Sequence, residues 1–108
     1  LGQDNDTEQH PFIKELESHF TPLDDFEASY SLIIEGIKNP LYIRVNDRDL
    51  LIQYGNEEQI DVVAKLSMEI MQSIVEGRMT FQRAFMTGDM TAKGNFKTLR
   101  TLDQIFPF

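Results

Sequence analysis

The sequence has no cysteine, no tryptophan and only two histidines in its 108 residues. The lack of cysteine excludes disulfides, thiolate metal ligands and cysteine nucleophiles. It is compatible with a reducing compartment, so we expect a cytoplasmic protein. His10 and His19 are nine residues apart, a spacing that places them on different faces of a helix. We therefore predict no metal site.

Motifs of the common enzyme classes are also missing. No HExxH, P-loop or GxGxxG pattern occurs, and no GxSxG nucleophile elbow is present. No apolar run approaches the ~20 residues that a membrane span requires. Residues 1–10 are polar and acidic, unlike a secretory signal. We therefore predict a protein that is not an enzyme and needs no cofactor.

Positive charge is scarce and unevenly distributed. The formal net charge is −8, which argues against nucleic acid as a partner. Residues 78–108 nevertheless carry five Lys or Arg and only two Asp or Glu. This basic third could face anionic head groups in a transient membrane contact, or it could consist of solvated helix faces.

Alternation of apolar and polar residues predicts strands in the first two thirds of the chain. An alternating segment presents one apolar face, as a sheet with a single buried face requires. Residues 46–49 have the composition of a tight turn, which favours hairpins between sequential, antiparallel strands. The alternating segments are residues 28–34, 41–45, 50–54 and 60–66.

Helical spacing dominates the remainder. A short helix is expected over residues 11–20, and Ser67, Thr80 and Asn95 have the positions of N-caps for three later helices. Residues 90–93 alternate again and predict a fifth strand. Residues 1–9 are expected to form a loose tail, and residues 10–108 a single domain. The order predicts an α+β fold with a five-stranded, mainly antiparallel sheet covered on one face by helices.

Methionine and phenylalanine are concentrated in the helical part. The residues from Met68 onward hold all five methionines and five of the eight phenylalanines. Methionine is flexible and suits surfaces that accept varied apolar partners. A gap between such helices and the sheet would fit an acyl chain or a ring system. The alternative is an ordinary packed core.

One segment resembles a known family. Residues 77–96 read GRMTFQRAFMTGDMTAKGNF and strongly resemble the sterol carrier protein 2 sterol-transfer domain. The matching features are Gly77-Arg78-Met79 after a helix, the Ala84-Phe85 step in a short helix, Gly88-Asp89, and the strand Met90-Thr91-Ala92-Lys93 followed by Gly94-Asn95. The resemblance covers residues 25–106 and is specific from Asp61 onward. It implies a five-stranded sheet with helices over one face.

The resemblance also implies a function. Members of that family bind fatty acids, fatty acyl-CoA, phospholipids or sterols in a hydrophobic tunnel between sheet and helices, without catalysis. The alternative is an accessory or dimerisation domain of a larger protein. Gln82 and Arg83 would lie near a mouth, and Ile60 and Leu66 would contribute to a floor. The tunnel lining implied for this chain is Met71, Ile74, Val75, Phe81, Phe85, Met86, Leu99, Leu102, Phe106, Val62 and Ala64.

Overall fold

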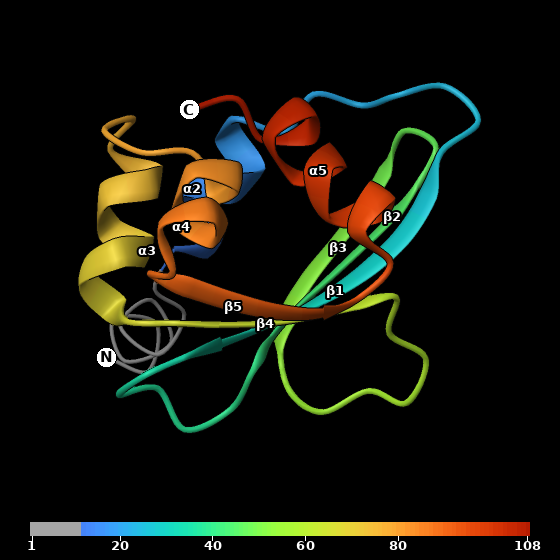
Figure 1. Cartoon of the computed structure of the whole chain (residues 1–108). Coiled ribbons are helices and arrows are strands. Elements are labelled where there is room, and N and C mark those ends of the chain that lie inside the picture. Colours follow the sequence, from blue (N-terminus) through green and yellow to red (C-terminus); the bar gives the residue numbers. More distant parts are fainter. Residues whose placement is uncertain (1–11) are drawn as a thin grey trace, which may run out of the picture.

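The computed structural model describes residues 12–108, in which four helices cover one face of a five-stranded sheet (Figure 1). This arrangement confirms the predicted α+β class. The helices are α2 (Ile13–Ser18), α3 (Met68–Val75), α4 (Phe81–Thr87) and α5 (Phe96–Ile105). The strands are β1 (Glu27–Ile34), β2 (Leu41–Asn46), β3 (Asp49–Tyr54), β4 (Val62–Leu66) and β5 (Met90–Gly94).

The sheet is mixed, with β1 at its centre and the strand order β3-β2-β1-β4-β5. Three of its four pairings are antiparallel, so the sheet is mainly antiparallel as predicted. The expectation of sequential hairpins is wrong at one place, because β4 pairs in parallel with β1 rather than with β3. Residues 55–61 make this crossover on the side of the sheet away from the helices (Figure 1).

The predicted N-caps of the three later helices are confirmed. The Ser67 hydroxyl accepts a hydrogen bond from the Ile70 N–H at 3.1 Å, and the Thr80 hydroxyl accepts one from the Arg83 N–H at 3.0 Å. Asn95 Oδ1 accepts two at the start of α5. These bonds satisfy N–H groups that have no partner within the helix, so local sequence fixes where each helix begins.

Several predicted boundaries change, and the first helix ends at Ser18 rather than at residue 20. The helix predicted over residues 11–20 begins at Ile13, because Phe12 before it has a left-handed backbone with φ 72°. Pro11 and the predicted tail at residues 1–9 lie outside the described residues. The strand predicted over residues 60–66 begins at Val62, so Ile60 is outside the predicted floor. Asp61 is instead held by β1, since its carboxylate accepts the Ser29 N–H at 3.0 Å.

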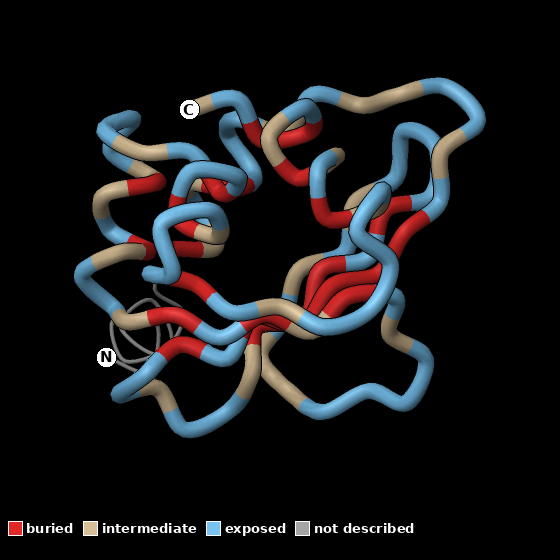
Figure 2. Tube along the Cα trace, viewed as in Figure 1, coloured by how far each residue is buried: buried red, intermediate tan, exposed pale blue. Residues whose placement is uncertain are grey.

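The core lies between the helices and the inner face of the sheet (Figure 2). Alternate residues of β1, including Tyr30 and Leu32, are fully buried there, as are Leu41 and Ile43 of β2. The opposite face of β1 carries Ser29 and Ser31, as expected for a sheet that packs helices on one side. The alternating pattern therefore identified the buried face of the sheet correctly.

Tyr30 connects the central strand to α5. Its side chain is buried, and its hydroxyl donates a hydrogen bond to the Thr98 carbonyl oxygen at 2.9 Å. Burial, and to a smaller extent the Asp61 carboxylate, raises the pKa of this hydroxyl well above its usual value of about 10. The group therefore remains a protonated donor at neutral pH.

Tyr30→Phe is expected to lower the free energy of unfolding by about 1–1.5 kcal/mol, because it removes this hydrogen bond but leaves the ring packing unchanged. Urea unfolding measures the difference. Tyr42→Phe is the matched control, since Tyr42 is buried and its hydroxyl has no hydrogen-bond partner within residues 12–108. An equal loss in both variants would show that the Tyr30 bond contributes nothing specific.

The same tyrosine and Tyr54 predict a loss of stability in alkali. Burial, followed by the Glu15 carboxylate, raises the pKa of Tyr54 to about 12. Above about pH 10 the unfolded chain loses these protons while the folded chain keeps them, so the free energy of unfolding decreases as pH rises. We expect the decrease between about pH 10 and 12 in thermal unfolding, and a smaller one in Tyr30→Phe. A stability unchanged over this range would contradict the assignment.

Candidate functional site

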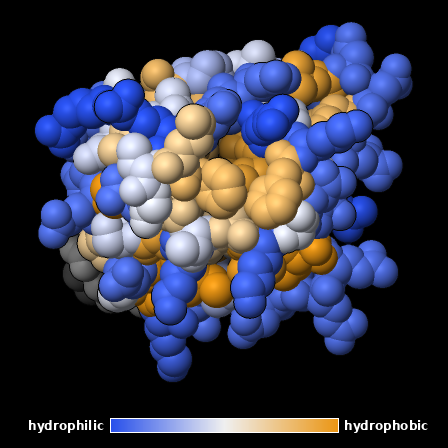
Figure 3. All heavy atoms as spheres, in the orientation of Figure 1, coloured by the Kyte–Doolittle hydropathy of each residue, from blue (hydrophilic) through white to orange (hydrophobic). Residues whose placement is uncertain are grey.

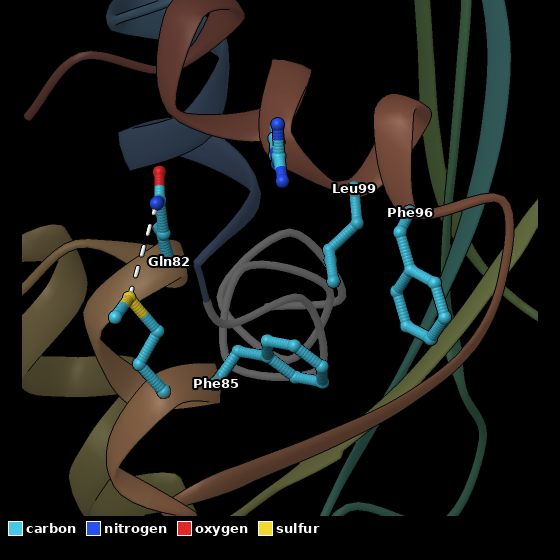
Figure 4. Close-up of a pocket in the computed structure, with 6 residues that line it drawn as sticks. Gln82, Phe85, Phe96 and Leu99 are labelled. Atoms are coloured by element: carbon cyan, nitrogen blue, oxygen red, sulfur yellow. Dashed lines mark hydrogen bonds between the residues drawn. The ribbon is translucent and has the colours of Figure 1, made fainter.

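An apolar pocket of about 450 Å³ lies between α4 and α5 (Figure 4). On the face drawn in Figure 3 it is seen as a hydrophobic hollow surrounded by hydrophilic side chains. Its volume is in the range of ~300–1,000 Å³ that small-molecule sites occupy. The residues that line it are Gln82, Phe85 and Met86 of α4 and Phe96, Leu99 and Arg100 of α5.

Aromatic rings from the two helices form the apolar part of the lining. Figure 4 shows Phe85, Phe96 and Leu99 projecting into the space between α4 and α5. The centroids of the Phe85 and Phe96 rings are 5.7 Å apart and the rings are tilted by 39°. Within the α4 wall, Gln82 Nε2 makes a weak contact of 3.9 Å with the Met86 sulfur one turn further along the helix. Such a surface offers dispersion contacts to a ligand and few fixed polar groups.

Asp103 ties the two walls of the pocket together at one end. From α5, its Oδ1 accepts the Phe81 N–H at 2.8 Å and its Oδ2 accepts the Gln82 N–H at 2.9 Å. These are the first two N–H groups of α4 and have no partner within that helix. The carboxylate thus fixes the position of α4 relative to α5.

Asp103→Ala is expected to lower the free energy of unfolding by about 1–2 kcal/mol, because two N–H groups of α4 lose their acceptor. Chemical denaturation measures this loss. The control is Gln104→Ala, an exposed neighbour on α5 that should change stability by less than about 0.5 kcal/mol. If Asp103→Ala were as stable as the control, Asp103 would not hold α4 in place.

The structure places the predicted lining residues in three different environments. Phe85, Met86 and Leu99 line the pocket, and Gln82, placed near a mouth from sequence, lines it as well. Val75 is partly buried against the core. The other predicted residues lie in the packed core: Met71, Ile74, Phe81, Leu102, Phe106, Val62 and Ala64. Leu66 is in the same core. Arg83 is exposed on α4 and does not line the pocket.

Two lining residues, Phe96 and Arg100, were not predicted. Phe96 belongs to the apolar side of α5, and its 53% exposure shows that this side extends beyond the core. Arg100 follows Phe96 by four residues and so lies on the same side of the helix. That spacing was a usable signal for both residues.

Three further pockets among the described residues are smaller. A pocket of about 200 Å³ contains the predicted residues Ile74 and Phe106 together with the chain segment at Pro107 and Phe108. Polar hollows on the outer face of the sheet are formed around Tyr42 and Arg44. Within residues 12–108, no three or more His, Cys, Asp or Glu side chains gather as a metal site would require. In that same range no helix has the length and apolarity needed to cross a membrane.

Comparison with known families adds the decisive observation. A family model described as the SCP-2 sterol transfer family matches residues 13–107. The chain belongs to the SCP-2 sterol transfer family. This confirms the resemblance found from residues 77–96, and membership supports a role in binding or transport of lipids or sterols. A search of curated proteins found no match.

Solved structures share the SCP-2 fold with this chain at low sequence identity. Palmitated sterol carrier protein 2-like 2 from Aedes aegypti aligns with a TM-score of 0.66 and 14% identity over 89% of this chain and 95% of its own. Sterol carrier protein 2 from Yarrowia lipolytica, in its apo form, gives a TM-score of 0.56 and 21% identity over 94% and 81%. These likenesses show a common fold.

The same fold also occurs inside a much longer protein. A double mutant of the sec-alkyl sulfatase PisA1 aligns with a TM-score of 0.76 and 17% identity over 90% of this chain. This chain spans 16% of the length of that structure. It spans 14% of a second structure of the enzyme, described as the stereoselective inverting sec-alkylsulfatase Pisa1 from Pseudomonas sp..

Proposed function

We propose that this SCP-2 family member binds an apolar ligand, without catalysis, in the pocket between α4 and α5. The ligand class is that of fatty acids, fatty acyl-CoA, phospholipids or sterols. The observation that carries the proposal is a pocket of about 450 Å³ lined mainly by Phe85, Met86, Phe96 and Leu99. The palmitated Aedes aegypti relative makes a fatty acid the first ligand to test.

The apolar lining is large enough for useful affinity. Burial of ~300 Å² of ligand surface at ~25 cal/mol/Å² contributes about 7 kcal/mol before the costs of association. This contribution alone therefore limits the affinity to the micromolar range at best, with little selectivity among apolar ligands. Among the lining residues that lie within the described range, Arg100 is the charged one, and its guanidinium suits a carboxylate or phosphate head group.

The deeper tunnel implied by the resemblance extends this proposal. Leu99 belongs both to the pocket and to the core cluster, so it separates the pocket from the buried residues behind it. A ligand longer than the pocket would displace Leu99 and come into contact with Phe81 and Leu102. Under this proposal the seven predicted residues in the core contact only such a long ligand.

Native mass spectrometry of the purified chain tests the proposal. We expect substoichiometric fatty acid or phospholipid adducts that disappear on denaturation, and uptake of added oleate at about tens of micromolar. Extraction and identification of the bound molecules would then name the ligand class. A ligand-free mass together with no uptake of oleate or fatty acyl-CoA would overturn the proposal.

A second candidate function is that of a module within a larger protein. It is favoured by the alkylsulfatase structures, of which this chain matches 16% and 14% of the length. In that case the domain would mediate dimerisation of the larger protein or present a substrate to its catalytic part. The lipid-uptake experiment distinguishes the two functions, because only a carrier requires a ligand in the isolated chain.

A further inference from the structure

Basic and apolar side chains are exposed together on the two helices that form the pocket. Met86 and Phe96 are 74% and 53% exposed, which is high for such large apolar side chains. Arg83, Lys97 and Arg100 are exposed on the same two helices. We call these five residues the mouth patch.

The positive charge of the mouth patch is not neutralised by neighbouring carboxylates. Within residues 12–108 the ion pairs are Arg48 with Asp24 and Arg78 with Glu76, neither of which involves the patch. Asp103, one turn beyond Arg100 on α5, is already engaged by two N–H groups of α4. The basic groups are therefore available to an external partner.

The rest of the molecule has the opposite charge. Residues 1–77 hold five Lys or Arg and 16 Asp or Glu, whereas residues 78–108 hold five and two. An anionic surface would repel most of the chain and attract the region of the mouth patch. Electrostatics alone would therefore orient the molecule with the pocket opening toward that surface.

We propose that the mouth patch docks on anionic lipid bilayers and places the pocket opening against the membrane. Exposed Met and Phe beside Lys and Arg match the interfacial region of a bilayer, where acyl chains meet anionic head groups. Helix α2 is a poor alternative, because it carries Glu15 and Glu17 against a single Lys14. Nucleic acid would offer phosphates but no apolar layer for Met86 and Phe96 to enter.

The docking surface and the ligand pocket share Met86, Phe96 and Arg100, but they can be tested separately. Docking would allow a lipid to pass between the bilayer and the pocket, and this part of the proposal rests on the proposed function. Vesicle binding itself does not, since the exposed basic and apolar side chains of the mouth patch would contact the bilayer whether or not the pocket holds a ligand. Arg83 and Lys97 are the basic residues of the patch that do not line the pocket, so they can be changed without altering the ligand site.

Sedimentation with vesicles tests the proposal. We expect the chain to bind vesicles of phosphatidylcholine containing about 30% phosphatidylserine, to ignore pure phosphatidylcholine, and to be released by about 0.5 M salt. Arg83→Glu combined with Lys97→Glu should weaken binding by at least about 50-fold, given roughly fivefold per basic group and added repulsion from each new carboxylate.

The control is Lys38→Glu combined with Lys65→Glu. These exposed lysines lie outside the mouth patch and give the same net charge, so the control should bind vesicles within about threefold of the parent chain. Oleate uptake without vesicles should be equal in all three proteins. Absence of vesicle binding, or equal loss in both double variants, overturns the docking surface. Absence of oleate uptake by the parent chain overturns the ligand pocket instead.

Discussion

Phe85→Glu is expected to lower the affinity of the pocket for oleate by at least about 100-fold. Phe85 is a partly buried member of the lining, with its ring 5.7 Å from that of Phe96. A carboxylate at this position would lose its hydration when an apolar ligand binds, which costs several kcal/mol. If the carboxylate instead turned out to solvent, the ligand would lose its contact with the Phe85 ring. The measurement is a titration with oleate followed by native mass spectrometry or by calorimetry.

Phe85→Leu is the matched control for this result. It keeps the position apolar, so affinity should fall by less than about fivefold. Urea unfolding of both variants checks that each is folded under the conditions of the binding titration. Equal binding by a folded Phe85→Glu variant would place the ligand somewhere other than between α4 and α5.

The largest effect on stability is expected at Gly94, the last residue of β5. Gly94 has φ +119°, and a Cβ atom there would lie 2.1 Å from the Asp61 carbonyl oxygen. That oxygen cannot move away easily, because it accepts the Asn95 N–H at 3.0 Å and precedes β4 directly. We therefore expect Gly94→Ala to lower the free energy of unfolding by about 4 kcal/mol in chemical denaturation.

Gly88→Ala separates backbone strain from steric overlap. Gly88 ends α4 with φ +85°, but a Cβ atom there would meet nothing within 4 Å. Its replacement should cost only the strain of a left-handed alanine, about 1–2 kcal/mol. If the two variants lost the same stability, the close approach of Gly94 to Asp61 would not matter energetically.

The local sequence predicted the positions of the helices and strands well, but it did not predict that β4 pairs with β1. Ser67, Thr80 and Asn95 cap helices because each bond involves residues two or three positions away. The pairing of Tyr30 with Val62 joins residues 32 positions apart, and nothing in either alternating segment encodes it. Alternation specifies which face of a strand is buried but not which strand lies beside it.

The candidate site was predicted in part for a similar reason. Leu99 and Leu102 have the same helical spacing on α5, yet only Leu99 lines the pocket, whereas both are buried. Periodicity identifies the side of a helix that turns away from water, and a packed core and a ligand cavity both require such a side. The exposure of Phe96 depends on how α5 sits against α4, which is a property of the assembled fold.

The central position of β1 also sets an order of events during folding. Strands β1, β2 and β3 are joined by short connections and can pair early, whereas the parallel pairing with β4 must wait until residues 55–61 have crossed the sheet. Until then one side of β1 presents unpaired N–H and C=O groups, a template for association with another chain. Because this closing step is non-local, we expect it to limit the refolding rate, and aggregation to compete with folding while it is incomplete.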